Sequence, residues 1–590
     1  MADPSIETLT ARPGLSRSTL VPERGALAQW YSEPGGEKRL RLYEYDTGET
    51  EQVPVESDAL DPPDVVRTFW TGSEFLLQSR PEVYRLPIGG DPEPLELQAE
   101  YTLVNDIDGD SRRLLYVHYA EPWTLRLRDR ETDTDWALSE HPEQEGFAGF
   151  SPDDEWVAYR ENPSESLGEG RQVVATTDGK VEAAFHVGDP ESRTRQRGWH
   201  PDGRRILLDD RSTGWYRTGL HDWRTDETTW FGTGERDELP AALSPDGETL
   251  VTIRRADGRC SAVRYPVDAP DEGQVLDLPG GEFDTRSATA VDLPNAGNEV
   301  LLRIGTATRP QRLFAYDLDA GEARVLEDTT TEALEAAPLV EPEYVTYEST
   351  DGFDIDAVLY RTESDRPGPA VVYVHGGPTT AERCDYDPFA QFLVGLGYSV
   401  LKPNYRGSTN RDRAFEAAIR GDSGYGDVDD VAEGGRWLAD RSWVDGDRLA
   451  VVGHSYGAYN AAMQAIRYPD LWSAAVVENG TLDRVEVLGD PNQYALRRVI
   501  DDPAEETTEA YLREISPVHR TDDVGTFVCV VHGAEGPGLE MAERFVEGFR
   551  ERGWSKGEEF RFEVIEGEGH VIGDVEPYWR LVADVLDERM

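Results

Sequence analysis

A serine at position 455 lies in a pattern that is typical of activated nucleophiles. Residues 453–459 read GHSYGAY and contain the pattern G-x-S-x-G. The apolar run RLAVV precedes the pattern, and the helix-like run AYNAAMQAIRYP follows it. A strand, a tight turn and a helix in this order push the serine hydroxyl to the edge of a sheet, and Gly453 and Gly457 permit the turn. Ser455 is therefore predicted to be the nucleophile of an acyl-transfer reaction.

A serine hydroxyl is a poor nucleophile until a base accepts its proton. In sheets with this nucleophile turn, the order along the chain is Ser, acid, His, so the histidine comes late. His570 has this position, because it follows the apolar run FRFEVIEG and precedes the last helix-like segment. We expect His570 to be the base. His532 comes too early in this order and is interpreted as a structural loop histidine.

The negative oxygen that forms during acyl transfer needs two backbone N–H donors. One is expected from Tyr456, the residue after the nucleophile. The other is expected from the loop after an early strand, where the sequence reads VVYVHGGP at 371–378. Gly377 is the predicted donor, because a residue without Cβ lets its backbone approach a substrate.

Strands and helices must alternate to position these residues. From about 340 onward, continuous apolar runs alternate with helix-like stretches, which predicts a mostly parallel sheet covered on both faces. The second half of the chain is therefore predicted to be an α/β-hydrolase domain, with an acid expected in the loop after FVCVV.

The first 340 residues predict β-structure with an internal repeat. Its clearest copies are FSPDDEWVAYREN, WHPDGRRILLDDRS and LSPDGETLVTIRRADGR, whose turn aspartates Asp153, Asp202 and Asp246 lie 49 and 44 residues apart. Four short strands per unit of this length are typical of propeller blades. We count seven units, with six or eight as alternatives, and expect type I′ turns at the Asp-Gly pairs.

The predicted organisation has two domains. A β-propeller occupies 26–338 and an α/β-hydrolase catalytic domain occupies 339–590. Residues 1–25 are expected to form an N-terminal segment that packs on the hydrolase domain.

The charge is strongly acidic, with 116 Asp and Glu against 59 Lys and Arg, a formal net charge of -57. Only four of the basic residues are Lys. Such a chain repels itself at ordinary salt, and molar salt screens that repulsion. The composition favours a halophilic protein over an ordinary acidic enzyme. It also argues against nucleic acid and anionic membranes as partners.

Other classes of site are not indicated. The three cysteines, Cys260, Cys384 and Cys529, fit no zinc spacing or disulfide framework, which favours free thiols in a reducing compartment. We find no P-loop, metal cluster or dinucleotide fingerprint, so no cofactor and no metal are expected. We also find no signal peptide and no apolar run that would span a membrane, so the expected location is cytoplasmic.

Taken with the propeller pattern, the motifs resemble the prolyl oligopeptidase family of serine peptidases, especially its acylaminoacyl-peptidase-like branch. They are VYVHGGP, PNYRGSTNRDRAFEAA, GDVDD, DRLAVVGHSYGAY and the late EGEGH. The resemblance implies a propeller that limits entry to short peptides, with Ser455, His570, Gly377 and Tyr456 in the roles above. The dipeptidyl-peptidase-like branch is disfavoured, because we find no paired glutamates on a helical stretch in 1–340.

The sequence departs from the family at the triad acid. The family loop resembles H-G-x-x-D-x-x-V-P, and here Gly536 stands at the aspartate position. Three replacements are open: Glu535 beside that position, Glu540 at the start of the next helix, and Glu478 at the end of the preceding strand. We expect Glu535.

The predicted function is therefore that of a serine peptidase that cleaves short or N-acylated peptides through an acyl-enzyme. A carboxylesterase with the same machinery is one alternative. A catalytically weak peptide-binding protein is another, and Gly536 is the feature that favours it. Short peptides are the expected partners, and the oligomeric state is left open, with a homo-oligomer among the options.

Overall fold

The computed structural model describes residues 5–590 except for the following positions: 11–13, 22–23, 33–37, 56–64, 80–81, 96, 98–101, 119–122, 141–147, 163–169, 190–193, 278–298, 365, 490–495, 497–498 and 501–507. The chain forms two compact units. We call Ala11–Thr331 the propeller unit, and Met1–Thr10 together with Glu332–Met590 the hydrolase unit.

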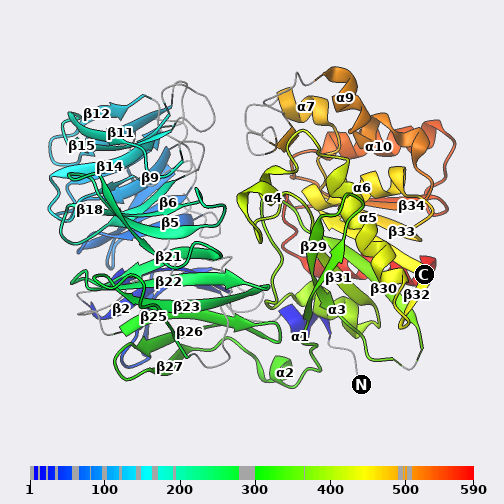
Figure 1. Cartoon of the computed structure of the whole chain (residues 1–590), viewed down its shortest axis with the longest axis horizontal. Coiled ribbons are helices and arrows are strands. Elements are labelled where there is room, and N and C mark those ends of the chain that lie inside the picture. Colours follow the sequence, from blue (N-terminus) through cyan, green and yellow to red (C-terminus); the bar gives the residue numbers. More distant parts are fainter. Residues whose placement is uncertain are drawn as a thin grey trace. The chain divides into compact units, whose positions relative to one another are not determined.

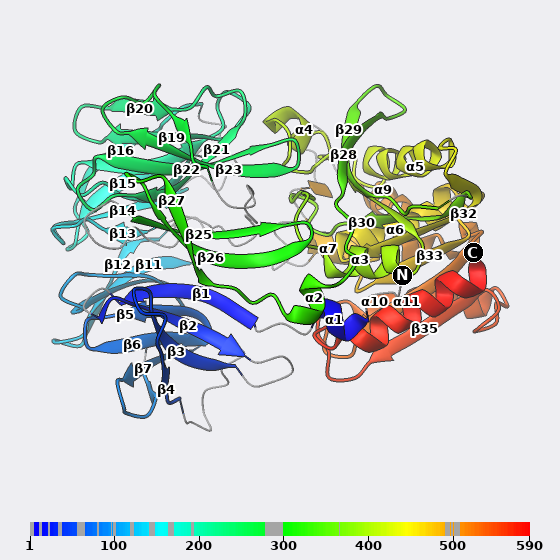
Figure 2. The same ribbon diagram turned by 90° about the horizontal axis from the view of Figure 1, so that it is seen from below.

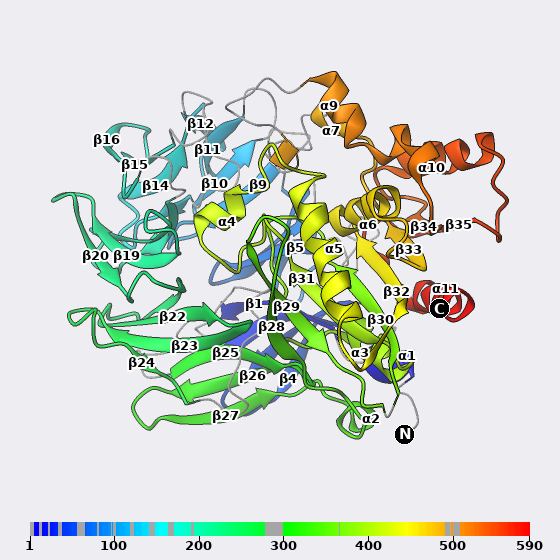
Figure 3. The ribbon, with the colours of Figure 1, turned by 45° about the vertical axis from the view of Figure 1, so that its right-hand side comes forward.

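The described residues of the propeller unit form seven antiparallel sheets, and each sheet contains only strands that are consecutive in the sequence (Figures 1 and 3). In order, the sheets are β1 (Gly14–Val21), β2 (Ala26–Ser32), β3 (Arg39–Glu44) and β4 (Thr50–Val53); β5 (Val65–Trp70), β6 (Glu74–Ser79), β7 (Glu82–Pro87) and β8 (Glu93–Pro94); β9 (Thr102–Ile107), β10 (Arg113–His118), β11 (Thr124–Asp129) and β12 (Thr134–Ser139); β13 (Gly149–Phe150), β14 (Trp156–Glu161), β15 (Arg171–Thr176) and β16 (Val181–Phe185); β17 (Arg195–Trp199), β18 (Arg205–Asp210), β19 (Arg217–Asp222) and β20 (Glu227–Phe231); β21 (Asp237–Leu243), β22 (Thr249–Ala256), β23 (Arg259–Pro266) and β24 (Gln274–Val275); and β25 (Glu299–Thr306), β26 (Arg309–Asp317) and β27 (Glu322–Glu327).

Apolar packing between neighbouring sheets closes the propeller. Each neighbouring pair encloses its own buried apolar cluster. The seventh and first sheets do the same, where Leu301 and Leu313 pack on Leu27 and Tyr45. Because each blade buries its faces only against its two neighbours, this arrangement is a closed ring of seven blades, as the repeat predicts.

The Asp-Gly turns that follow a proline differ from the expected type I′. Gly203 and Gly247 have positive φ angles of 65° and 76°, but the aspartates before them do not. The N–H of Gly203 donates to the carbonyl of His200 at 3.0 Å, so Pro201 is the second residue of the turn. The prediction of type I′ is wrong for these turns, because proline fixes φ near −65° and type I′ requires a positive φ at that position. It is confirmed at Asp257–Gly258, where both residues have positive φ angles, 51° and 71°, in the two-residue loop that joins β22 to β23.

The described residues of the hydrolase unit contain one eight-stranded sheet, with the strand order β28-β29-β31-β30-β32-β33-β34-β35. The strands are β28 (Glu343–Glu348), β29 (Asp354–Tyr360), β30 (Gly368–Val374), β31 (Ser399–Asn404), β32 (Val444–His454), β33 (Ala474–Glu478), β34 (Phe527–Gly533) and β35 (Phe560–Ile565). The first three in this order pair antiparallel, and the others pair parallel.

Helices cover both faces of this sheet. Figure 2 shows α5 (Gly426–Ala439) and α11 (Val575–Arg589) on opposite sides. Adjacent residues of β32 face opposite sides of the sheet. Val451 packs on the side of α5 and α6 (Tyr456–Arg467), and Val452 packs on the side of α3 (Pro388–Gly395) and α11. This alternation explains the continuous apolar runs in the sequence. Within the described residues, the helices of the unit are α1 (Ile6–Thr10), α2 (Glu332–Glu335), α3 (Pro388–Gly395), α4 (Arg413–Ala417), α5 (Gly426–Ala439), α6 (Tyr456–Arg467), α7 (Arg484–Gly489), α9 (Glu509–Glu514), α10 (Leu539–Glu551) and α11 (Val575–Arg589), with short 3₁₀ turns η5 (Pro517–His519) and η6 (Thr521–Asp523).

The N-terminal segment divides between the two units. Ile6 and Leu9 on α1 are buried in the hydrolase unit, where the carbonyl of Leu9 accepts a hydrogen bond from the Tyr386 hydroxyl at 2.9 Å. Residues 14–21 instead form β1, which pairs with β2 in the first blade. The expectation that all of 1–25 packs on the hydrolase domain is wrong for β1, because its backbone pairs with the propeller. Within the described part of the chain, every helix is too short or too polar to span a lipid bilayer.

Candidate active site

Ser455 lies at a sharp bend between β32 and α6, with φ 57° and ψ −116°. A positive φ is strained for a residue with a side chain, and it is the conformation that a nucleophile elbow requires. The neighbouring glycines are sterically necessary. A Cβ on Gly453 would lie 2.1 Å from the carbonyl oxygen of Gly457, and a Cβ on Gly457 would lie 2.0 Å from that of Val374. No other residue fits either position without moving the backbone.

His570 meets Ser455 across the end of the sheet. Its Nε2 lies 3.0 Å from the Ser455 Oγ, and it follows β35 in the loop before α11. Asn479 holds this loop: its side-chain amide donates to the carbonyl of His570 at 3.0 Å, and its oxygen accepts from the N–H of Gly533 at 2.9 Å. The structure thus brings together the predicted nucleophile and base at hydrogen-bond distance, which proton transfer requires.

The HGG loop lies directly against the nucleophile. A Cβ on Gly376 would be 3.1 Å from the Cβ of Ser455. The next residue, Gly377, has a φ of 115°, a region that glycine adopts readily. Tyr456 is the first residue of α6, and the first N–H groups of a helix have no partner within it. The two predicted oxyanion donors, Gly377 and Tyr456, therefore belong to two segments that both adjoin Ser455.

Buried aromatic rings support both of these segments. The ring of Tyr405 stacks on His375 with centroids 4.4 Å apart and on Tyr456 with centroids 6.0 Å apart. The Tyr456 hydroxyl donates to Asp427 at 3.0 Å. Burial raises the pKa of Asp427 to about 6. The two supporting residues, Tyr405 and Asp427, lie in the motifs NYRGST and GDVDD. In the sequence these motifs indicate only the family resemblance.

The structure does not bring Glu535 to His570. Among the described residues, the buried Nδ1 of His570 has no hydrogen-bond partner. The Glu535 side chain is exposed, and its backbone N–H donates to the carbonyl of Glu568 at 2.9 Å. Glu540 is also exposed, in the first turn of α10. The expectation for Glu535 is therefore corrected: the tight turn after β34 fixes its backbone and leaves its side chain in solvent.

The acid position itself is closed by packing. A Cβ on Gly536 would lie 3.1 Å from the Cε1 of His532 and 3.2 Å from the carbonyl carbon of Gly569. These are tight contacts, so a larger residue would have to displace its neighbours. The expectation of a loop histidine at His532 is corrected, because His532 is buried near the end of β34, where its Nδ1 lies 2.8 Å from the carbonyl oxygen of Gly533.

The electrostatic environment lowers the pKa of His570. Burial is the largest cause, and the nearby His454 and His532 act in the same direction. Glu478 acts in the opposite direction. A buried donor without a partner costs about 1–3 kcal/mol, so the Nδ1 side of His570 is an unfavourable feature of the resting site.

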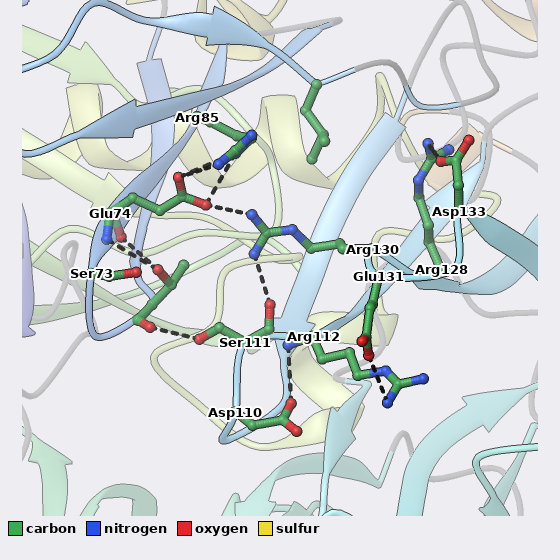
Figure 4. Close-up of a pocket in the computed structure, with 12 residues that line it drawn as sticks. Ser73, Glu74, Arg85, Asp110, Ser111, Arg112, Arg128, Arg130, Glu131 and Asp133 are labelled. Carbon is green, nitrogen blue, oxygen red and sulfur yellow. Dashed lines mark hydrogen bonds and ion pairs between the residues drawn. The ribbon is translucent and has the colours of Figure 1, made fainter.

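A separate cavity of about 650 Å³ lies in the propeller unit and contains none of these residues (Figure 4). Four arginines line it, and each of them is ion-paired. Arg85 and Arg130 both bind Glu74, and the other two bind acidic partners: Arg112 with Asp129 and Glu131, and Arg128 with Asp133. The cavity is therefore lined by an internal network of ion pairs. Across the residues that the structure describes, no three His, Cys, Asp or Glu side chains are grouped to hold a metal ion.

Comparison with solved structures identifies the same two-unit fold. A puromycin-hydrolysing peptidase of Mycobacterium tuberculosis superposes with a TM-score of 0.85 at 18% identity, covering 100% of this chain and 96% of that one. A puromycin hydrolase superposes with a TM-score of 0.81 at 20% identity, covering 100% and 97%. At these identities the likeness concerns the fold.

Sequence relatives match less than half of the chain. The dipeptidyl aminopeptidase BIII of Pseudoxanthomonas mexicana is 28% identical over 258 residues, which is 41% of this chain and 37% of the relative. The acylamino-acid-releasing enzyme of Sus scrofa is 29% identical over 171 residues, which is 28% of this chain and 23% of the relative. The matched region therefore spans well under half the length of either relative.

A family model matches within the hydrolase unit. Residues 385–587 match the prolyl oligopeptidase family, and this segment contains the elbow serine, the late histidine and the strands that end beside them. Residues 385–587 of the hydrolase unit thus match the prolyl oligopeptidase family, in agreement with the resemblance of the motifs.

Proposed function

We propose that the protein is a serine peptidase that hydrolyses short or N-acylated peptides through an acyl-enzyme. The observation that carries this proposal is the contact of 3.0 Å between the Ser455 Oγ and the His570 Nε2 at a strained elbow. The match of residues 385–587 to a peptidase family supports it.

The proposed reaction has two halves. Ser455 Oγ attacks the carbonyl carbon of the scissile bond while its proton passes to the His570 Nε2, and the N–H groups of Gly377 and Tyr456 stabilise the oxyanion. His570 then gives the proton to the leaving amine, and the C–N bond breaks. In the second half, water attacks the acyl-enzyme, His570 takes a proton from it, and the acid product leaves as that proton returns to Ser455.

The nucleophile is tested with a fluorophosphonate probe. The wild type is expected to be labelled at Ser455, and Ser455→Ala is expected to remain unlabelled. Equal labelling of both proteins would overturn the assignment. A second elbow variant, Gly453→Ala, is not a suitable control, because its Cβ would collide with the backbone.

Substrate class is tested by comparing three kinds of small substrate in molar salt. We expect hydrolysis of an N-acyl-amino-acid anilide to exceed that of an unrelated p-nitrophenyl ester, whereas the reverse preference would favour a carboxylesterase. An aminoacyl amide of the puromycin type is the third substrate, because the similar folds include enzymes with that name. A size limit, which the family resemblance suggests, predicts faster cleavage of short peptides than of unfolded proteins.

A catalytically weak peptide-binding protein is the second candidate. The observation that favours it is the absence of a hydrogen-bond partner, among the described residues, on the Nδ1 of His570. Breaking the interaction between histidine and acid in a serine triad costs about 10⁴ in turnover. Peptide binding with no detectable turnover would support this candidate, and multiple turnovers would exclude it.

A further inference from the structure

The catalytic pair has an electrostatic requirement that the β34 loop does not meet. When His570 accepts the proton of Ser455, it becomes an imidazolium, and a nearby carboxylate stabilises that charge. No carboxylate stands at Gly536, and both glutamates of the loop, Glu535 and Glu540, are exposed. The compensating charge therefore has to come from another element.

Glu478 is a buried carboxylate at the end of β33, with a relative exposure of 6%. In the parallel register it stands opposite His454, and its carbonyl accepts the N–H of Ser455 at 2.9 Å. Its Oε1 lies 3.2 Å from the Nδ1 of His454, and the rings of His454 and His570 have centroids 5.1 Å apart. One imidazole ring thus links the carboxylate to the catalytic histidine.

The other buried carboxylates of the described hydrolase unit bind groups outside this cluster. Their contacts are Glu382 with Lys402 at 2.5 Å, Asp427 with the Tyr456 hydroxyl at 3.0 Å, Asp430 with Arg406 at 2.7 Å, and Asp483 with Arg544 at 3.2 Å. Glu478 differs from them, because its Oε1 lies 3.2 Å from a ring nitrogen of His454, a histidine of the nucleophile motif.

The backbone around Glu478 also fixes both catalytic residues. Glu478 pairs in the sheet with His454, the residue before the nucleophile. Asn479, the residue after Glu478, donates a hydrogen bond to the carbonyl of His570. A carboxylate on this strand end keeps its place relative to Ser455 and His570 because hydrogen bonds tie all three backbones together.

We propose that Glu478 is the charge-compensating residue of the Ser455–His570 pair and takes the place of the acid missing at Gly536. The proposal rests on the proposed function. Glu478 touches no reacting atom, so it acts as a positioning residue, sharing its charge between His454 and His570. The titratable groups that face His570 are Glu478 from β33, His454 from β32 and His532 from β34.

The test is the pH dependence of Ser455 labelling by a fluorophosphonate probe in Glu478→Gln, Glu478→Asp and Glu535→Gln. Glu478→Gln is expected to slow labelling by about 10² to 10⁴-fold. Its acid limb is also expected to shift to lower pH, because the carboxylate raises the pKa of His570. Glu478→Asp keeps the charge, so its labelling rate is expected to lie between those of the wild type and Glu478→Gln. Its acid limb is expected to lie close to that of the wild type. Glu535→Gln, a matched control in the loop, is expected to behave as the wild type.

These outcomes separate the proposal from the function on which it rests. Wild-type labelling rates and an unshifted acid limb in Glu478→Gln, with folding verified by thermal denaturation, would overturn the role of Glu478. A loss of rate in Glu535→Gln would also overturn it and return the acid to the β34 loop. Labelling that persists in Ser455→Ala would instead refute the nucleophile, whatever the glutamate variants do. If Glu478→Gln does not fold, the labelling rates of Glu478→Asp and Glu535→Gln decide the question: slower labelling of Glu478→Asp supports the role of Glu478, and equal rates overturn it.

Discussion

Replacing Asn479 should separate the stability of the active-site scaffold from its chemistry. Asn479 is fully buried, has a φ of 51°, and joins two loops through its side chain. In Asn479→Gly, the buried N–H of Gly533 loses its acceptor, which costs about 1–3 kcal/mol. The part-buried carbonyl of His570 loses its donor, and because water can reach it, this costs about 0.5–1.5 kcal/mol. The expected loss of unfolding free energy is therefore about 1.5–4.5 kcal/mol.

Asn479→Ala makes the same deletions and adds backbone strain. An alanine in the left-handed region costs about 1–2 kcal/mol, which glycine avoids. Alanine should therefore be less stable than glycine by about 1 kcal/mol in urea denaturation in molar salt. Both variants should also lose about 10²-fold in turnover, because a displacement of about 1 Å at His570 has that effect on catalysis.

Asn479→Asp distinguishes the two hydrogen bonds. Its carboxylate still accepts from Gly533, but it has no donor for the carbonyl of His570. We expect it to lose turnover as the glycine variant does while retaining more of the stability. The reasoning would be refuted if Asn479→Gly matched the wild type in both unfolding free energy and turnover, or if alanine proved more stable than glycine.

Three further outcomes are expected. In Gly457→Ala, the Cβ would meet the carbonyl oxygen of Val374 at 2.0 Å, so fluorophosphonate labelling should be abolished, and normal labelling would contradict the tight elbow. Burial, with His454 and His532, lowers the pKa of His570 from 6.5, so its neutral form should persist below that value. The acid limb of kcat/KM should therefore lie below pH 6.5, and a pH–rate profile that already falls above it would contradict this. With a net charge of -57, the melting temperature should rise between about 0.1 M and about 1 M KCl as the Debye length shortens from about 10 Å to about 3 Å, and a flat curve would show that self-repulsion is unimportant.

Much of the fold is predictable because its signals are local. The repeating turns at Asp153, Asp202 and Asp246 mark successive blades, and a blade is built from residues that are close together in sequence. The type of those turns was predicted incorrectly, because Pro201 was not weighed against the Asp-Gly pair. The first strand, β1, was also missed: its pairing with β2 is a property of the propeller and not of residues 14–21 alone.

The nucleophile and the base were identifiable from the sequence, since the elbow is a local pattern and His570 follows from the order of the strands. The third member of the site was not. Glu535 was favoured because it is adjacent to the missing aspartate, but adjacency in sequence does not determine where a side chain points. Parallel strands that are distant in sequence end side by side, and their register sets Glu478 against His454. The loop after β35 brings the carbonyl of His570 to the side chain of Asn479. The sequence by itself determined which residues could react, and only the tertiary structure decided which charges and hydrogen bonds surround them, because burial and pairing across strands arise when the sheet assembles.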